Sequence, residues 1–226
     1  MERCEMKVIA RIRTDFQEKF GVPRQSGLVP ELQGTVVFEP EFRSAEAVRG
    51  LDGFSHLWLI WEFSEAVREG WSPTVRPPRL GGNQRMGVFA TRSPFRPNPI
   101  GLSSVQLEKV ELDPELGPVL HVRGADLMDG TPIFDIKPYV PYADSHPAAS
   151  GGFTSGLDTA NLKVNCPGAL LEKFPAEKRT ALLAVLANDP RPRYQDDPKR
   201  VYGMAFGGVT VKFSVAGDRL TVLTVE

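Results

Sequence analysis

Arginine and proline gather in one stretch of the chain, and their spacing carries the clearest chemical signal in the sequence. The stretch "GVFATRSPFRPNPIGLSS" (Gly87–Ser104) holds Arg92 and Arg96 among three prolines. It lies within a longer segment, Ser72–Leu107, that contains five arginines and no aspartate or glutamate. Proline fixes its own φ and disfavours the helical conformation of the preceding residue, so this loop is stiff. A stiff loop with two guanidinium groups suits a carboxylate, a phosphate or a nucleic-acid backbone. A structural proline turn with solvated or paired arginines fits the same residues equally well.

Two other segments repeat the combination of arginine with proline. "TVRPPRLGGNQR" places Arg76 and Arg79 before a pair of glycines, which permit close approach of a ligand to the backbone. "NDPRPRY" places Arg191 and Arg193 directly after an apolar helical pattern. A solvated surface loop explains the first segment as well, and a helix end at Pro190 explains the second.

Acidic residues and histidine offer weaker candidates for chemistry. "GADLMDGTPIFDIKPY" contains Asp126, Asp129 and Asp135, which could hydrogen-bond a ribose or an amino group, although aspartates that form turns are commoner. Their spacing does not match a calcium loop, and no metal is expected. His56 precedes a very apolar segment, where a structural role is commoner than that of a base. The sequence contains neither GxGxxG nor GxxxxGK[ST], which disfavours a Rossmann dinucleotide fold and a P-loop NTPase.

The elements that must position these residues are mostly short strands. Before residue 140, β-branched and apolar runs of strand length alternate with loops rich in glycine and proline, and "HLWLIWEF" (His56–Phe63) is apolar on both faces. Only "SAEAVRGL" is predicted to be helical there, with Ser44 as N-cap and Gly50 as its end. The other candidate strands are "KVIARIRT", "GTVVFE", "MGVFATR", "IGLSSVQLEKVEL", "GPVLHVRGADL" and "PIFDIKPY". This pattern is typical of a barrel or a strongly curved sheet.

The composition changes near residue 147. "YADSHPAASGGFTSGLD" (Tyr142–Asp158) has no apolar periodicity and predicts a linker or mobile loop. Beyond it, "PAEKRTALLAVLAND" predicts a helix that begins at Pro175, and "GVTVKFSVAGDRLTVLTV" predicts a hairpin with its turn at 216–218. The sequence therefore predicts a mainly β protein, with a β-barrel domain at 1–147 and a small α+β domain at 148–226 after a flexible linker.

Overall composition limits the class of protein. The 226 residues carry a formal net charge of −1, so a nucleic acid would have to be bound by a local basic patch. The start of the chain has no apolar leader and no window approaches the length of a membrane span, which predicts a cytoplasmic protein without membrane attachment. Cys4 and Cys166 show no metal-binding spacing and are expected to be free thiols.

Six motifs resemble the tRNA methyltransferase O (TrmO) family, a TsaA-like β-barrel family. They are "EKFGVPRQSGLV", "EAVRGLDGFSHLWLI", "WSPTVRPPRLGGN", "GVFATRSPFRPNPIGLS", "DLMDGTPIFDIKPY" and "NDPRPRY". The resemblance implies a homodimeric, S-adenosylmethionine-dependent methyltransferase that modifies N6 of threonylcarbamoyladenosine at position 37 of the tRNA anticodon loop. It also implies a β-barrel in place of a Rossmann fold.

The resemblance further implies which residues of this chain form the site. The residues implied for binding the cofactor are Arg24, Gln25, Ser26, Gly27, Leu28, Ser64, Glu65, Arg92, Leu102, Asp126, Leu127, Met128 and Asp129. The residues expected to contact tRNA are Arg76, Arg79, Arg96, Arg191 and Arg193. No catalytic base is identified. Asp129 and His56 are the candidates, and positioning of the substrate without a base is the preferred mechanism.

Two other classes of function remain open from the sequence. A non-enzymatic RNA- or anion-binding module would keep the arginine loops without a pocket for a methyl donor. A methyltransferase acting on a small metabolite would bind the donor but would show no salt-sensitive affinity for tRNA.

Overall fold

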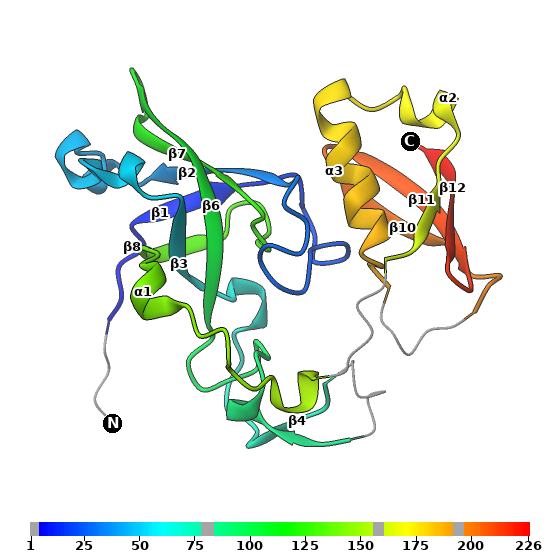
Figure 1. Ribbon diagram of the computed structural model, residues 1–226, viewed down its shortest axis with the longest axis horizontal. Helices are drawn as coiled ribbons and strands as arrows, with labels where there is room; N and C mark the ends of the chain where they lie inside the picture. Colours follow the sequence, from blue (N-terminus) through cyan, green and yellow to red (C-terminus); the bar gives the residue numbers. More distant parts are fainter. Residues whose placement is uncertain (1–4, 78–83, 156–160, 192–196) are drawn as a thin grey trace.

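A closed barrel and a four-stranded sheet organise the described part of the chain. The computed structural model describes residues 5–77, 84–155, 161–191 and 197–226 (Figure 1). No helix within these ranges is long and apolar enough to cross a membrane.

The first sheet closes into a six-stranded barrel. Its strand order is β1-β2-β7-β6-β3-β8, and every neighbouring pair is antiparallel. The strands are β1 (Ala10–Arg13), β2 (Gln33–Phe38), β3 (His56–Glu62), β6 (Ile100–Asp113), β7 (Gly117–Arg123) and β8 (Pro132–Pro138). The prediction of a mainly β protein built on a barrel is confirmed.

Alternation along the strands fills the barrel. Leu57, Leu59 and Trp61 of β3 are buried inside it, and the residues between them lie on the outer face. The outer face is covered in part by α1 (Pro141–Asp144), where the Asp144 carboxylate accepts a hydrogen bond of 2.9 Å from Trp58 Nε1. The apolar character of both faces of β3 therefore has a structural reason.

Strands β6 and β7 separate at one end of the barrel. They pair from Asp113 and Gly117 as far as Gln106 and Arg123, and the remaining part of β6 pairs only with β3. The loop of residues 24–28 enters the opening. The backbone N–H of Gly27 donates to Gly124 O at 2.8 Å, and the N–H of Ser104 donates to Ser26 Oγ at 3.2 Å. The loop thus supplies hydrogen bonds that β7 would otherwise make.

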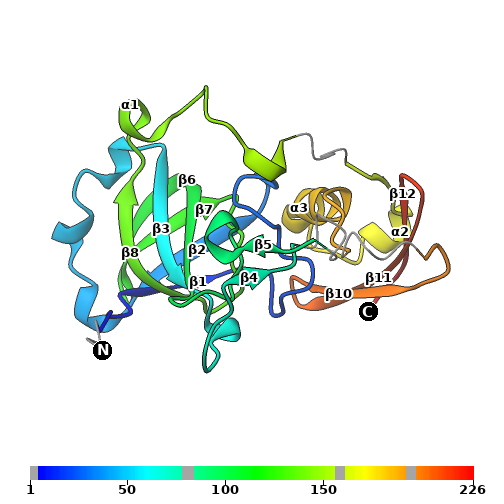
Figure 2. The same cartoon turned by 90° about the horizontal axis from the view of Figure 1, so that it is seen from below.

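The second sheet has the order β10-β11-β12-β9, and α3 covers one of its faces (Figures 1 and 2). Its elements are β9 (Lys163–Asn165), α2 (Gly168–Leu171), α3 (Ala176–Ala187), β10 (Tyr202–Phe206), β11 (Val209–Ala216) and β12 (Arg219–Val225). The predicted helix begins after Pro175, and the predicted hairpin turns between Ala216 and Arg219. Both predictions are confirmed.

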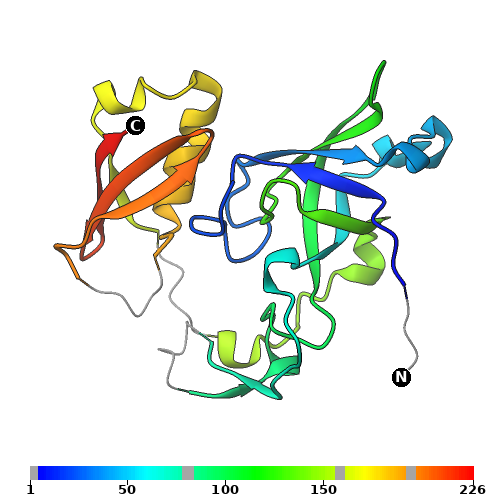
Figure 3. The ribbon, with the colours of Figure 1, turned by 180° about the vertical axis from the view of Figure 1, so that it is seen from behind.

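The core of the second sheet includes residues from the N-terminal part of the chain. Phe16, Val29 and Leu32 are buried in the same cluster as Phe174 and Phe206. Figure 3 shows the loop between β1 and β2 extending from the barrel to the second sheet. The predicted boundary at 147/148 stays a prediction, and the second core takes residues from both sides of it.

Two local expectations were wrong. "SAEAVRGL" forms a short 3-10 helix (Ala45–Val48) and not an α-helix, and Ser44 makes no side-chain capping bond. "MGVFATR" contains only β5 (Met86–Gly87), which pairs with β4 (Thr74–Val75), before a 3-10 turn. The start of the predicted linker is anchored, because it forms α1 and bonds to β3 through Asp144, and the linker as a whole stays a prediction. Residues 156–160 of that linker lie outside the described residues.

Candidate cofactor site

The opening between β6 and β7 brings together residues from four separate segments. Asp126 follows β7, Ser103 lies on β6, Ser26 lies on the entering loop, and Arg92 lies on the proline-rich loop. The Asp126 carboxylate accepts a hydrogen bond of 2.5 Å from Ser103 Oγ and another from the backbone N–H of Ser26. Arg92 acts on this carboxylate through its positive charge. The structure thus brings Arg92, Ser26 and Asp126 together, and their binding of the cofactor stays a prediction.

Opposing effects act on the charge of Asp126. Burial raises the pKa of its carboxyl above the ordinary value, and this is the largest effect. The hydrogen bonds from Ser103 and from backbone N–H groups, together with the charge of Arg92, act in the opposite direction. Asp126 is therefore a partly buried acid whose charge depends on the donors around it.

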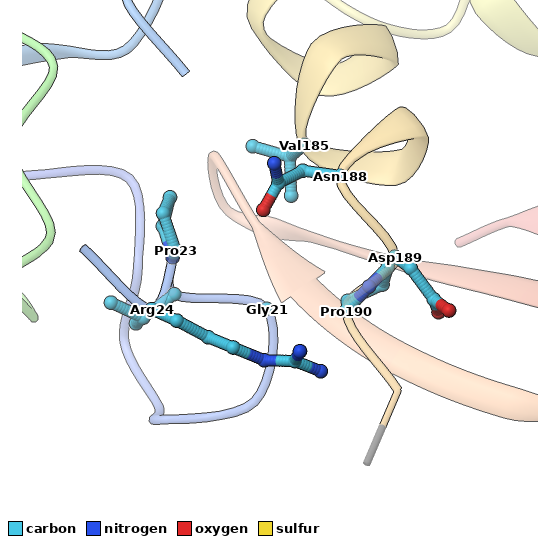
Figure 4. Close-up of a pocket in the computed structure, with 8 residues that line it drawn as sticks. Gly21, Pro23, Arg24, Val185, Asn188, Asp189 and Pro190 are labelled. Atoms are coloured by element: carbon cyan, nitrogen blue, oxygen red, sulfur yellow. The ribbon is translucent and has the colours of Figure 1, made fainter. Parts of the chain in front are cut away.

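The loop of residues 24–28 links this site to the second sheet. Arg92 Nη1 donates to Gln25 Oε1, so the two predicted cofactor residues are in contact. Arg24 instead donates from Nη2 to the backbone oxygen of Arg191 at 2.7 Å. The Arg24 side chain points toward the end of α3 in Figure 4, where it lines a cleft with Gly21, Asp189 and Pro190. That cleft has a volume of about 20 Å³, which suffices for about one water molecule but not for a nucleoside.

Apolar side chains border the polar cluster. Leu28 is 40% exposed, on the same loop as Ser26, and Leu102 is 55% exposed, next to Ser103 on the outer face of β6. Ser64 and Glu65 are exposed in the 3-10 turn after β3, beside the start of β6, where the Phe63 N–H donates to Pro99 O at 2.8 Å. Among the described residues, no hydrogen bond or ion pair connects Ser64 or Glu65 with Asp126 or Arg92. Their place in the site stays a prediction.

The predicted turn from Asp126 to Asp129 divides into two parts. The Leu127 side chain is buried in the barrel core, so it can offer a ligand only backbone atoms. Asp129 Oδ1 accepts the Thr14 N–H at 2.9 Å, and the Asp129 N–H donates to Phe16 O. Met128 O accepts Thr131 Oγ1 at 2.7 Å. These bonds hold the turn against the end of β1, and only Asp126 takes part in the polar cluster with Ser103.

Neither candidate base is presented to the Asp126 cluster. His56 is exposed at the start of β3, where Nδ1 lies 3.0 Å from Ser55 Oγ and the ring contacts Tyr139. Asp129 faces a hollow that Arg11, Arg13 and Glu39 also line. The structure gives no support to either residue as the base.

The arginines predicted to contact tRNA have different environments. Arg76 is exposed directly after β4, whereas Arg96 donates to Thr91 O at 2.9 Å and thereby holds its own loop. Arg191 is 8% exposed and pairs with Asp189, with 2.9 Å between Nε and Oδ1, so its side chain packs within the second module. This burial argues against the predicted contact between Arg191 and tRNA. The other two arginines predicted to contact tRNA, Arg79 and Arg193, lie outside the described residues.

Two features of the site were missed at the level of sequence. Ser103 is fully buried on the inward face of β6, where it accepts a hydrogen bond of 2.9 Å from Trp61 Nε1. The sequence did carry a signal for this bond, because Ser103 is a polar residue at an inward position of the alternation Gly101, Ser103, Val105.

The second missed feature is a pair of exposed rings. Trp71 and Phe89 are 54% and 72% exposed with ring centroids 6.0 Å apart, beside the acid-free segment. This pair could not be predicted from the sequence, because the two rings are 18 residues apart and come together only in the folded chain.

Family models cover most of the chain. The model described as the tRNA-methyltransferase O N-terminal domain matches residues 11–145, and the TrmO C-terminal domain matches residues 162–226. The chain belongs to the TrmO family.

Curated and solved relatives of this TrmO-family chain match it over most or all of its length. An Escherichia coli protein named tRNA (adenine(37)-N6)-methyltransferase is 41% identical, with 100% of this chain and 99% of the relative covered. A Pseudomonas aeruginosa protein that carries the provisional name of an S-adenosylmethionine-dependent methyltransferase is 43% identical over 87% of this chain and 86% of its own length. The crystal structure of TrmO from P. aeruginosa superposes with a TM-score of 0.81 at 33% identity, covering 100% of this chain and 99% of that chain.

Proposed function

We propose that this protein transfers a methyl group from S-adenosylmethionine to N6 of adenosine 37 in tRNA, where that adenosine carries a threonylcarbamoyl group. The observation that carries the proposal is the convergence of Arg92, Gln25, Ser26 and Asp126 at the opening between β6 and β7. Membership of the TrmO family supports the same reaction, since a full-length relative bears the name of this activity.

The residues at the opening fit the cofactor chemically. S-adenosylmethionine supplies the methyl group on a positively charged sulfur, and it also presents a carboxylate, an ammonium group and ribose hydroxyls. Arg92 and the amide of Gln25 suit the carboxylate, and Asp126 suits the ammonium group or the hydroxyls. Leu28 and Leu102 offer exposed apolar surface beside these polar groups. A site that does not surround the sulfur with carboxylates avoids stabilising the charge that is lost during transfer.

The arginine-rich segment suits an RNA partner. Arg76 and Arg85 are exposed around the β4–β5 ribbon, and no acid lies between Ser72 and Leu107. The exposed ring pair of Trp71 and Phe89 adds a surface on which unstacked bases can lie. A single-stranded anticodon loop combines phosphates with accessible bases, and this combination favours tRNA over a small metabolite.

We assign the rate to positioning and not to a base from this chain. His56 and Asp129 are engaged elsewhere, with Ser55 and with the Thr14 N–H. Arginine groups that hold the substrate carboxylate and phosphates would place N6 in line with the methyl group, and alignment of this kind contributes several kcal/mol, roughly 7–11 in favourable cases. The N6 proton would then leave to solvent. We further propose that the protein acts in the cytoplasm. We also propose that it forms a homodimer, and sedimentation equilibrium would test this oligomeric state.

The reaction is tested with hypomodified tRNA. Protein and S-adenosylmethionine are incubated with tRNA that carries threonylcarbamoyladenosine 37 but lacks its methyl group, and nucleosides are then identified by mass spectrometry. We expect a gain of one methyl group on that nucleoside alone. A parallel tRNA with plain adenosine 37 should remain unmethylated, because it lacks the carboxylate that an arginine would hold. Equal methylation of both tRNAs would refute the specificity, and methylation of neither would refute the proposed reaction.

A further inference from the structure

Behind Asp126 lies a chain of hydrogen bonds that reaches into the barrel. Trp61 Nε1 donates to Ser103 Oγ at 2.9 Å, and Ser103 Oγ lies 2.5 Å from Asp126 Oδ1. Trp61 is 6% exposed and Ser103 is fully buried, so water does not compete for either bond.

The chemistry of these groups determines which group donates and which accepts in each of these hydrogen bonds. An indole N–H can only donate, and a serine hydroxyl has one hydrogen to give. Because Trp61 occupies an acceptor position of Ser103 Oγ, the Ser103 hydrogen is free to point at Asp126. The short O···O distance is typical of a hydroxyl that donates to a carboxylate.

Neighbouring residues hold Trp61 and Ser103 in place. The Trp61 ring lies directly over Gly101, where an added Cβ would come within 2.2 Å of ring atoms. Ser103 faces the barrel from the position on β6 that pairs with Leu59 of β3. Both donors are therefore fixed by strands, whereas Arg92 and Ser26 act on Asp126 from loops.

We propose that Ser103, oriented by Trp61, is a positioning residue that keeps the Asp126 carboxylate ionised and aimed at the cofactor. The inference rests on the proposed function, because it assumes that Asp126 binds S-adenosylmethionine. Ser103 itself is fully buried, so it would act on a bound ligand through Asp126.

The first test measures affinity without turnover. Ser103→Ala should weaken binding of S-adenosylmethionine and of S-adenosylhomocysteine about tenfold by calorimetry, because the Asp126 carboxylate loses the buried donor that orients it and favours its charged form. The matched control is Ser104→Ala, which removes a hydroxyl from the outer face of the same strand and should change affinity less than twofold. Thermal unfolding of each variant verifies the fold.

The second test is the pH dependence of affinity. Asp126 is acted on by the positive charge of Arg92 and by hydrogen-bond donors from Ser103 and Ser26. Removing the Ser103 donor raises the pKa of Asp126 further, so loss of affinity on acidification should begin at a higher pH in Ser103→Ala than in the wild type. The cofactor's own groups titrate alike in both experiments. A purely structural role would lower stability without moving this profile.

The third test is a double-mutant cycle. Trp61→Phe should weaken cofactor binding severalfold in the wild type, but it should have no further effect in Ser103→Ala, because the hydroxyl that it orients is gone. Additive effects, or a pH profile unchanged by Ser103→Ala, would overturn the proposal. Absence of cofactor binding by the wild type would instead refute the proposed function.

Discussion

Two arginines of the proline-rich loop at the barrel opening have different surroundings. Arg92 is exposed on a proline-stiffened loop and contacts Gln25, whereas Arg96, four positions later, bonds its own loop backbone. The two arginines look alike in sequence. The structure leaves Arg92 exposed beside Gln25, which is compatible with the proposed binding of an anion, and it gives Arg96 a loop-holding role.

We expect Arg92→Ala to weaken binding of S-adenosylmethionine at least tenfold, since a charge-assisted pair with a carboxylate contributes on the order of 1.5–3 kcal/mol. Calorimetry measures this effect, and circular dichroism verifies the fold. Arg85→Ala is the control, because it removes the same charge from the same acid-free segment. If both variants lose affinity equally, the effect comes from the general positive field and not from a contact of Arg92.

At the scale of elements, one strand pair depends on a missing side chain. Gly101 of β6 pairs with Trp61 of β3, and the indole occupies the space of its absent Cβ. The close packing of the ring on Gly101 places Trp61 Nε1 where it donates a hydrogen bond to Ser103 Oγ. A glycine inside a barrel strand is thus explained by packing and not by backbone conformation.

Gly101→Ala should destabilise the fold by about 3 kcal/mol, because an added Cβ would overlap a ring that cannot move without disturbing the core. Thermal unfolding should show a fall of roughly 6–12 °C in Tm. Gly87→Ala provides the comparison, since its Cβ would meet nothing within 4 Å. Similar losses in both variants would contradict the packing explanation.

Elements with local periodicity were predictable from sequence, and elements that depend on distant contacts were not. The spacing of Leu182, Val185 and Leu186 was sufficient to predict α3, because that pattern is complete within the helix. "SAEAVRGL" carries helical composition, yet Arg49 is extended and Gly50 has φ of 80°, so the turn ends after four residues. The Ser103 bonds were hidden because Asp126 and Trp61 come from other elements.

At the scale of the whole molecule, the segment between β1 and β2 connects the candidate cofactor site to the second sheet. Gly21 has φ of 100°, and its Cα faces Met204, whose Sδ would lie 2.4 Å from an added Cβ. Asp15 pairs with Lys178 at 2.5 Å, and Phe16 meets Phe206 with ring centroids 5.3 Å apart. The position of the loop that carries Ser26 is therefore set in part by the second module.

Gly21→Ala should lower both Tm and affinity for S-adenosylmethionine, because backbone strain and the overlap with Met204 would displace the loop. Gly50→Ala is a matched control, since that glycine also has positive φ but would meet nothing within 4 Å. The control should lose about 1 kcal/mol of stability from strain alone and should keep its affinity. Equal loss of affinity in both variants would contradict the idea that packing against the second sheet sets the position of the cofactor-site loop.

The sharing of Phe16 and its neighbours between the two sheets has a consequence for the nascent chain. Glu18 bonds the backbone N–H of Ala205 across a separation of 187 residues. At translation rates of about 5–20 residues per second, roughly 10–40 s separate the synthesis of Phe16 from that of its partner Phe206. The barrel strands are complete before that interval ends, but the loop that carries Phe16 does not yet have the strands of the second sheet to cover it. The nascent protein is thus expected to offer this loop to ribosome-associated chaperones until its last strands leave the exit tunnel.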